Sequence, residues 1–238
     1  MQTYKVFADY HTHTYYSHGK GSPRDNVLSA IERGLDLVAV SEHGPGHIFY
    51  GVRGKKLERL NDELNSLRRE FEGKIDVRRG LELNVTGFGR TDCPKDRDSC
   101  DVIILGYHKG IAPKNRLALH VWGESLLGIK GDPRRNAEGI LAAAESCRAD
   151  IISHPNLYLK VDVPYMAECC RQMGILLEVN SARVTLSKEE LIAIKAAGCG
   201  LVIGSDAHTP GRVGDFALAS EAVSEAGVWD IVKNARPV

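Results

Sequence analysis

Short apolar runs alternate with longer amphipathic stretches along the chain. Runs rich in branched aliphatic side chains predict buried strands over residues 5–10, 35–40, 75–83, 101–107, 150–153, 175–179 and 200–204. Helical spacing and cap residues predict helices over residues 22–33, 57–71, 132–147, 163–173, 187–197, 215–226 and 228–235. Strands that alternate with helices in this way are typical of an α/β protein with a parallel sheet.

The seven predicted strands favour a distorted (β/α)7 TIM-like barrel over a doubly wound sheet. Polar side chains suited to metal binding follow nearly every strand, and they must meet at one point if they act together. A closed ring of strands allows this, whereas an open sheet gathers ligands only at its switch point. We expect residues 1–238 to form a single domain, because no repeat, low-complexity tract or linker interrupts the pattern.

Histidines and acidic residues lie at the ends of most of these apolar runs. The C-terminal end of a parallel strand points into the mouth of a barrel, where active sites of this architecture lie. The residues concerned are His11, His13, His43, Glu82, His108, His154, Asp206 and His208. Convergence of so many nitrogen and oxygen ligands predicts a site for several metal ions, and such sites are typical of hydrolytic enzymes.

Two triplets with the same spacing strengthen this prediction. In His11-Thr12-His13 and in Asp206-Ala207-His208, the outer residues project to the same face of a strand. Either triplet alone is a weak signal, but the first and last strands of a barrel are neighbours, so the two would meet. Glu82 lies between leucines in RGLELNV, where a carboxylate is costly unless it is paired or bound to metal.

Composition narrows the class of protein without identifying it. Of 238 residues, 43% are hydrophobic and 26% are charged, and 31 basic residues balance 31 acidic ones. This balance argues against a nucleic-acid-binding surface. The sequence has no signal-peptide pattern and no apolar stretch long enough to span a membrane, so we expect a cytoplasmic protein with reduced cysteines. A homo-oligomer is compatible with the sequence.

The chain resembles the PHP (polymerase and histidinol phosphatase) domain phosphoesterases over essentially its full length. The motifs that carry the resemblance are, in order, DYHTHTYYSHG, VSEHG, RGLELN, GYH, ISHP and GSDAH. The chain is most similar to small stand-alone bacterial phosphatases of this family and to the PHP module of bacterial family X polymerases. It departs from the family pattern at Glu42, where an aspartate usually precedes the histidine of the second motif.

This resemblance implies nine metal ligands, adding His18 to the eight residues above. They would hold three divalent ions, most simply Zn²⁺, with Mn²⁺ or Fe as alternatives. One ion would bind His11, His13, Glu82 and Asp206, a second Glu82, His108 and His154, and a third His18, His43 and His208. The implied reaction is hydrolysis of a small phosphorylated substrate by a hydroxide that bridges two ions. The catalytic group would comprise His11, His13, Glu82, His154, Asp206 and His208.

Residues around these ligands carry weaker expectations. Asp9 and Glu42 are expected to orient ligands from behind rather than to touch metal. Four residues that follow strand ends are candidates for substrate contact: His47, Arg53, Arg183 and Arg212. His120 has no strand-end context and is interpreted as structural.

Three alternatives stay open at this point. The substrate could be histidinol phosphate or a nucleic-acid 3′ end, although the neutral charge weakens the latter. The chain could be a metal-binding PHP module without turnover, but such modules lose ligands and all nine are present here. An amidohydrolase acting on C–N bonds would also use an HxH triplet, but His18 and the DAH triplet favour a phosphoesterase.

Overall fold

Seven parallel strands form the centre of the molecule, as the alternating pattern predicts. The computed structural model describes residues 2–94, 97–109, 111 and 131–238. Neighbouring strands follow one another in chain order: β2 (Ala8–Thr12), β3 (Leu37–His43), β4 (Asp76–Gly87), β6 (Val102–Gly106), β7 (Ile151–Ile152), β8 (Leu176–Asn180) and β9 (Leu201–Gly204). The strands curl into a nearly closed α/β barrel of the TIM-like type, so this prediction is confirmed. A short strand, β5 (Arg90–Thr91), pairs antiparallel with β4.

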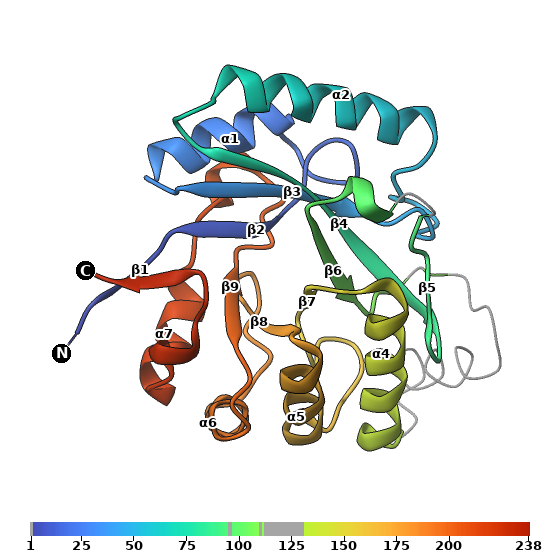
Figure 1. The fold of residues 1–238 in the computed structure, drawn as a ribbon, viewed down its shortest axis with the longest axis vertical. Coiled ribbons are helices and arrows are strands. Elements are labelled where there is room, and N and C mark those ends of the chain that lie inside the picture. Colours follow the sequence, from blue (N-terminus) through green and yellow to red (C-terminus); the bar gives the residue numbers. More distant parts are fainter. Residues whose placement is uncertain (1, 95–96, 110, 112–130) are drawn as a thin grey trace.

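Helices cover the outside of the barrel. They are α1 (Pro23–Glu32), α2 (Lys55–Glu70), α4 (Pro133–Cys147), α5 (Val163–Met173), α6 (Lys188–Ala196) and α7 (Ala217–Ala226). Figure 1 shows α1 and α2 on one side of the strands and α4 to α7 on the other. Ser22 and Ser187 each form a capping box at a helix start, and Asp132 accepts from the Arg134 amide, so these helices begin where the cap residues indicate.

The barrel strands are buried on both faces. In β6, Val102 and Ile104 belong to a cluster inside the barrel, while Ile103 and Leu105 pack among residues of the surrounding helices. Every β6 residue is buried. Continuous burial explains why the strands appear in the sequence as unbroken apolar runs and why a polar residue at a strand end is conspicuous.

The barrel closes between β9 and β2 by two different means. At the C-terminal ends of the strands, the His13 amide donates to the Ala207 carbonyl at 2.8 Å. At the other end, the buried Asn234 side chain bridges the two strands. Its Nδ2 donates to the carbonyls of Ala8 and Ile203, both at 2.7 Å, and its Oδ1 accepts from the Ile203 amide at 3.0 Å. One side chain thus replaces part of a ladder between the first and last strands.

This closure corrects two sequence predictions. The expected strand over residues 5–10 is split into β1 (Tyr4–Val6) and β2, because β1 leaves the barrel to pair with β10 (Ala235–Pro237). The expected helix over residues 228–235 is wrong: only the 3-10 turn η3 (Trp229–Ile231) is helical. A turn at Lys233 and Asn234 follows it and places the Asn234 side chain between the strands. Two further 3-10 turns are η1 (Arg97–Ser99) and η2 (Pro210–Arg212).

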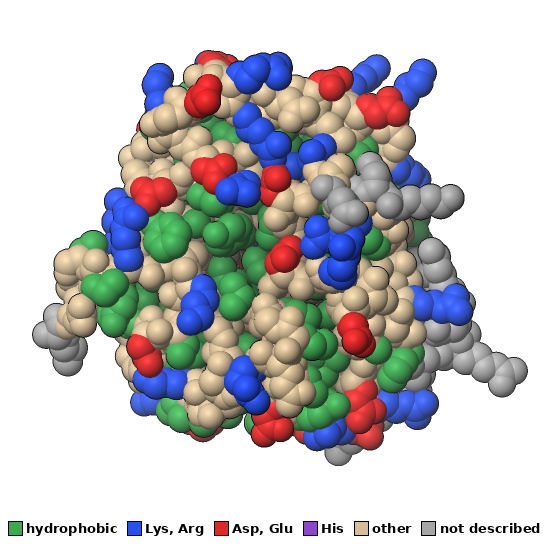
Figure 2. Space-filling view, viewed as in Figure 1, with side chains coloured by type: hydrophobic (Ala, Val, Ile, Leu, Met, Phe, Trp, Pro, Cys, Tyr) green, Lys and Arg blue, Asp and Glu red, His purple; other side chains and the backbone are tan. Residues whose placement is uncertain are grey.

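The surface shows no extreme of charge or hydrophobicity on the face in view. Lys and Arg side chains lie interspersed with Asp and Glu across it, with apolar side chains between them (Figure 2). In the described ranges, every helix is too short or too polar to cross a membrane.

Replacing Asn234 with alanine should destabilise the barrel by about 3 kcal/mol, because three buried backbone groups would lose their partner. Urea unfolding of chelator-treated protein measures this without a contribution from bound metal. Asn65→Ala on the exposed face of α2 is the matched control and should change stability by less than about 0.5 kcal/mol. Equal stability of the two variants would show that the closure does not depend on Asn234.

Candidate metal centre

The mouth of the barrel gathers the histidines and acids that the sequence places at strand ends. His11 lies in β2 and His43 ends β3, while Glu82 lies in β4 in register with His43. His108 lies two residues after the end of β6, and His154 lies two residues after the end of β7. Asp206 and His208 follow β9. Because neighbouring strands are parallel, all these side chains are brought to the same end of the barrel.

Glu82 is the centre of this group. Its carboxylate is 1% exposed, and five imidazoles surround it. The Oε1 atom lies 3.0 Å from His108 Nε2, 3.0 Å from His154 Nε2 and 3.3 Å from His11 Nε2. The Oε2 atom lies 3.0 Å from His43 Nδ1 and 3.5 Å from His13 Nε2. Each carboxylate oxygen therefore faces a different set of nitrogens, which is the arrangement required of a bridging ligand.

The remaining candidates lie on the His13 side of Glu82. Asp206 Oδ1 is 3.4 Å from His13 Nε2 and 3.5 Å from His208 Nδ1. The His18 ring centroid is 4.1 Å from that of His208 and 4.9 Å from that of His43. The structure thus brings all nine predicted ligands together, including His18 from the loop after β2.

The donor set suits divalent metal ions. Three subsets have ligand atoms within 4.8 Å of one another: His11, His13 and Glu82; His43, Glu82 and His108; and His13, His43 and His208. Buried nitrogens of three of these histidines lie near carboxylate oxygens but are not aligned for a hydrogen bond with any described residue: His11 Nε2, both ring nitrogens of His13, and His43 Nδ1. Buried polar atoms of native proteins are normally satisfied, so these nitrogens point to an ion that they would bind.

A second layer of polar side chains orients the imidazoles. Glu178 in β8, which we did not single out from the sequence, lies with its Oε1 2.7 Å from His11 Nδ1. Its Oε2 accepts from the His154 amide at 3.0 Å and from Asn180 Nδ2 at 3.0 Å. Asn84 Oδ1 lies 2.9 Å from His108 Nδ1. Partners of this kind fix which ring nitrogen is free to bind metal.

Two glycines leave room for this layer. A Cβ atom on Gly204 would lie 2.1 Å from Glu178 Oε1, and one on Gly106 would lie 2.7 Å from the His108 ring. Both strands therefore need glycine where they pass behind the site.

The two residues expected behind the ligands act differently from one another. Asp9 accepts from the amides of His11, Ser205 and Gly214, so it supports a ligand through the backbone rather than through an imidazole ring. Glu42 accepts from the Thr14 amide at 2.9 Å, and its Oε2 lies 3.9 Å from His13 Nδ1. Glu42 therefore holds the loop that leads to His18 and also faces a ligand.

A pocket of about 380 Å³ opens beside the cluster. Its lining includes His47, as expected of a residue in contact with substrate, together with Tyr50, Lys109 and Tyr158. The three arginine candidates are not among its lining residues. Arg53 donates to the Pro45 carbonyl, Arg212 pairs with Asp215 at 2.9 Å, and Arg183 lines a separate surface depression. His120 lies outside the described residues.

Burial lowers the pKa values of the clustered imidazoles and neighbouring carboxylates raise them, and the balance differs from one histidine to the next. Burial lowers the pKa of His11, but Glu178, Glu82 and Asp206 outweigh it and hold that pKa well above its usual range. Burial also lowers the pKa of His13, but Asp206, Glu42 and Glu82 outweigh it and raise that pKa to about 9. Desolvation prevails at His43, whose pKa falls well below its usual range. Burial and the neighbouring His208 lower the pKa of His18 to about 3. In the absence of metal, protons on some of the imidazoles, but not on all of them, would therefore balance the negative charge of the carboxylates.

Comparison with known proteins gives a consistent picture. A family model described as "PHP domain" matches residues 9–182, a span that contains seven of the nine candidate ligands and ends before Asp206 and His208. A protein of Shewanella sediminis named a probable phosphatase is 26% identical over 93% of this chain and 86% of its own length. One from Thermoanaerobacter sp. with the same description is 28% identical over 97% of this chain and 91% of its own length.

A solved structure shares the fold. Histidinol phosphate phosphatase from Lactococcus lactis, described in complex with zinc, L-histidinol and phosphate, superimposes with a TM-score of 0.61. The similarity covers 91% of this chain and 94% of that one at 18% sequence identity.

Glu178→Gln should weaken metal binding about 10- to 100-fold while leaving the barrel folded, because the neutral amide no longer anchors the His11 ring. Zinc titration with a competing chelator measures the affinity, and circular dichroism checks the fold. Glu168→Gln, at an exposed position of α5, is the matched control. Unchanged zinc affinity in Glu178→Gln would refute the orienting role.

Zinc binding at pH 7.5 should release about one proton or more, because a ligand imidazole must be neutral and the pKa of His13 is about 9. Observed zinc affinity should therefore rise with pH up to that value. Calorimetric titrations in buffers of different ionisation enthalpy give the proton count directly. A slope of zero across buffers would contradict the protonation pattern.

Proposed function

The chain belongs to the PHP domain family of metal-dependent phosphoesterases, and from this premise we propose that it is a phosphatase that hydrolyses small phosphate monoesters with the help of three divalent ions. The observation that carries the proposal is the Glu82 carboxylate, buried among five imidazoles at 3.0 to 3.5 Å. A carboxylate within a histidine cluster is a ligand set that can hold neighbouring divalent ions, as multinuclear hydrolytic sites do.

We assign the ions according to the family pattern. His11, His13, Glu82 and Asp206 would hold the first, Glu82, His108 and His154 the second, and His18, His43 and His208 the third. The geometric subsets overlap these assignments, with His13 and His43 lying between neighbouring groups. When bound, such ions lower the pKa of water and neutralise charge on phosphoryl oxygens.

The protein's own residues position and shield the reaction. Glu178 and Asn84 fix the His11 and His108 rings, and Ser153 Oγ donates to Glu82 Oε1 at 3.1 Å. His47, 6% exposed, stacks against His43 with ring centroids 5.0 Å apart and lines the pocket. We assign it to contact with the substrate. The described lining of the pocket contains no arginine, so the ligand cluster itself would bind the phosphate group.

Purified protein should contain about three zinc, manganese or iron ions per chain and hydrolyse 4-nitrophenyl phosphate in a chelator-sensitive manner. His11→Ala and Asp206→Ala should reduce turnover by about 1,000-fold or more with the fold retained. Asp62→Ala, at an exposed position of α2, is the control. Elemental analysis and phosphate release on the same samples test this. Wild-type turnover in either ligand variant would refute the site, and fully loaded but inactive protein would refute the reaction.

A further inference from the structure

Two segments contribute aromatic and aliphatic side chains to the lining of the pocket beside the ligand cluster, and we call them its first and second walls. Phe49 and Tyr50 form one wall, from the segment after β3, and Leu157 and Tyr158 form the other, from the loop after β7. A volume of about 380 Å³ lies within the range of small-molecule pockets. The part of the substrate that leaves with the ester oxygen would therefore lie between these walls.

The first wall is fixed to the metal ligands. The Tyr50 ring stacks on the His18 ring, with centroids 4.5 Å apart and an interplanar angle of 22°. The Tyr50 amide donates to His47 Nδ1 at 3.2 Å, and the Gly51 amide donates to the His47 carbonyl at 3.1 Å. Phe49 lines the pocket and is 76% exposed, and its neighbours Ile48 and Tyr50 are also exposed, so three consecutive large apolar side chains face solvent here.

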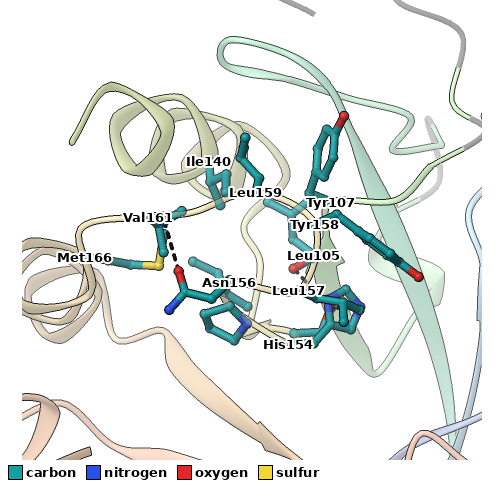
Figure 3. A pocket seen from close by; sticks show the side chains of 13 residues that line it. Leu105, Tyr107, Ile140, His154, Asn156, Leu157, Tyr158, Leu159, Val161 and Met166 are labelled. Atoms are coloured by element: carbon teal, nitrogen blue, oxygen red, sulfur yellow. Dashed lines mark hydrogen bonds between the residues drawn. The ribbon is translucent and has the colours of Figure 1, made fainter. Parts of the chain in front are cut away.

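The second wall is held by the loop that begins at His154. Asn156 adopts a left-handed backbone conformation with φ of 70°, and its Oδ1 accepts from the Val161 amide at 3.0 Å, closing the loop (Figure 3). Leu159 and Val161 are buried against the helices, and this anchors the loop from below. Leu157 and Tyr158, in the middle of the loop, are left facing the pocket.

One positive charge lies at the second wall. The Lys109 ammonium is 5.1 Å from the centroid of the Tyr158 ring, and Lys109 follows the candidate ligand His108 directly. A cation against an aromatic ring at a pocket edge can pair with an anionic group of a molecule that stacks on the same wall. Lys109 is exposed, so such a pair would be screened by solvent and of moderate strength.

From these features we propose that the preferred substrate is the phosphate monoester of an aromatic alcohol whose ring carries an acidic substituent. The inference rests on the proposed phosphatase function. The phosphate would face the ligand cluster and the ring would stack between Tyr50 and Tyr158. The acidic substituent would pair with Lys109. A cationic leaving group such as an amino alcohol would instead be repelled by the same lysine.

The test compares kcat/KM of metal-loaded protein for four monoesters: 4-carboxyphenyl phosphate, phenyl phosphate, ethyl phosphate and 2-aminoethyl phosphate. Phenyl phosphate should exceed ethyl phosphate by more than the difference in leaving-group reactivity. That excess should fall by about 3- to 10-fold in Tyr158→Leu. The carboxyl substituent should raise kcat/KM by about 5-fold over phenyl phosphate.

Lys109→Gln should remove the advantage of the carboxyl substituent, and Lys109→Arg should keep most of it. Lys160→Gln, in the same loop as Tyr158 but exposed, is the matched control and should retain the wild-type preference. Equal loss for substituted and unsubstituted phenyl esters in Lys109→Gln would overturn the assignment of Lys109. Equal discrimination between phenyl and ethyl esters in Tyr158→Leu and wild type would overturn the aromatic wall. Hydrolysis of none of the four esters by loaded protein would instead overturn the proposed function.

Discussion

The burial of one carboxylate governs the arrangement of this molecule. Glu82 is 1% exposed inside a barrel of aliphatic strands, where an unpaired negative charge would cost several kcal/mol. Five imidazoles from four other strand ends surround it. The imidazole nitrogens can offset this negative charge in two ways, by carrying protons or by binding metal cations. Because the pKa values of His11 and His13 are raised and that of His43 is lowered, protons would compensate the charge in only part of the cluster.

The barrel makes this convergence geometrically feasible, and it does so at some conformational cost. The candidate ligands His154 and Asp206 both have positive φ angles, of 30° and 49°, which non-glycine residues adopt at about 1–3 kcal/mol each. Glu178 and Asp9 stabilise these strained segments from behind, through the His154 amide and the Ser205 amide respectively. Closure through Asn234 keeps β2 and β9 adjacent, so that the two ligand triplets meet. Fold and site are therefore stabilised by overlapping sets of buried polar groups.

The sequence predicts the barrel strands and the convergence of the candidate ligands because both leave local signals. Buried strands are continuous apolar runs, and a histidine at the end of such a run is conspicuous. Glu178 was missed, although it lies in a strand between apolar residues just as Glu82 does. Its orienting role depends on His11, which lies 167 residues away. The turn that carries Asn234 and the backbone contacts of Asp9 likewise depend on long-range pairing that no local pattern encodes. The arginines were plausible by residue type, but only tertiary structure shows which loops line the pocket.

The most direct test of this account is a crystal structure of the zinc-loaded protein with anomalous data collected above and below the zinc edge. We predict anomalous peaks on both sides of the Glu82 carboxylate, within about 2.3 Å of its oxygens and of the His11, His13, His108 and His154 nitrogens. Zinc bound elsewhere, with Glu82 still contacting only the imidazoles, would contradict the central role of this residue.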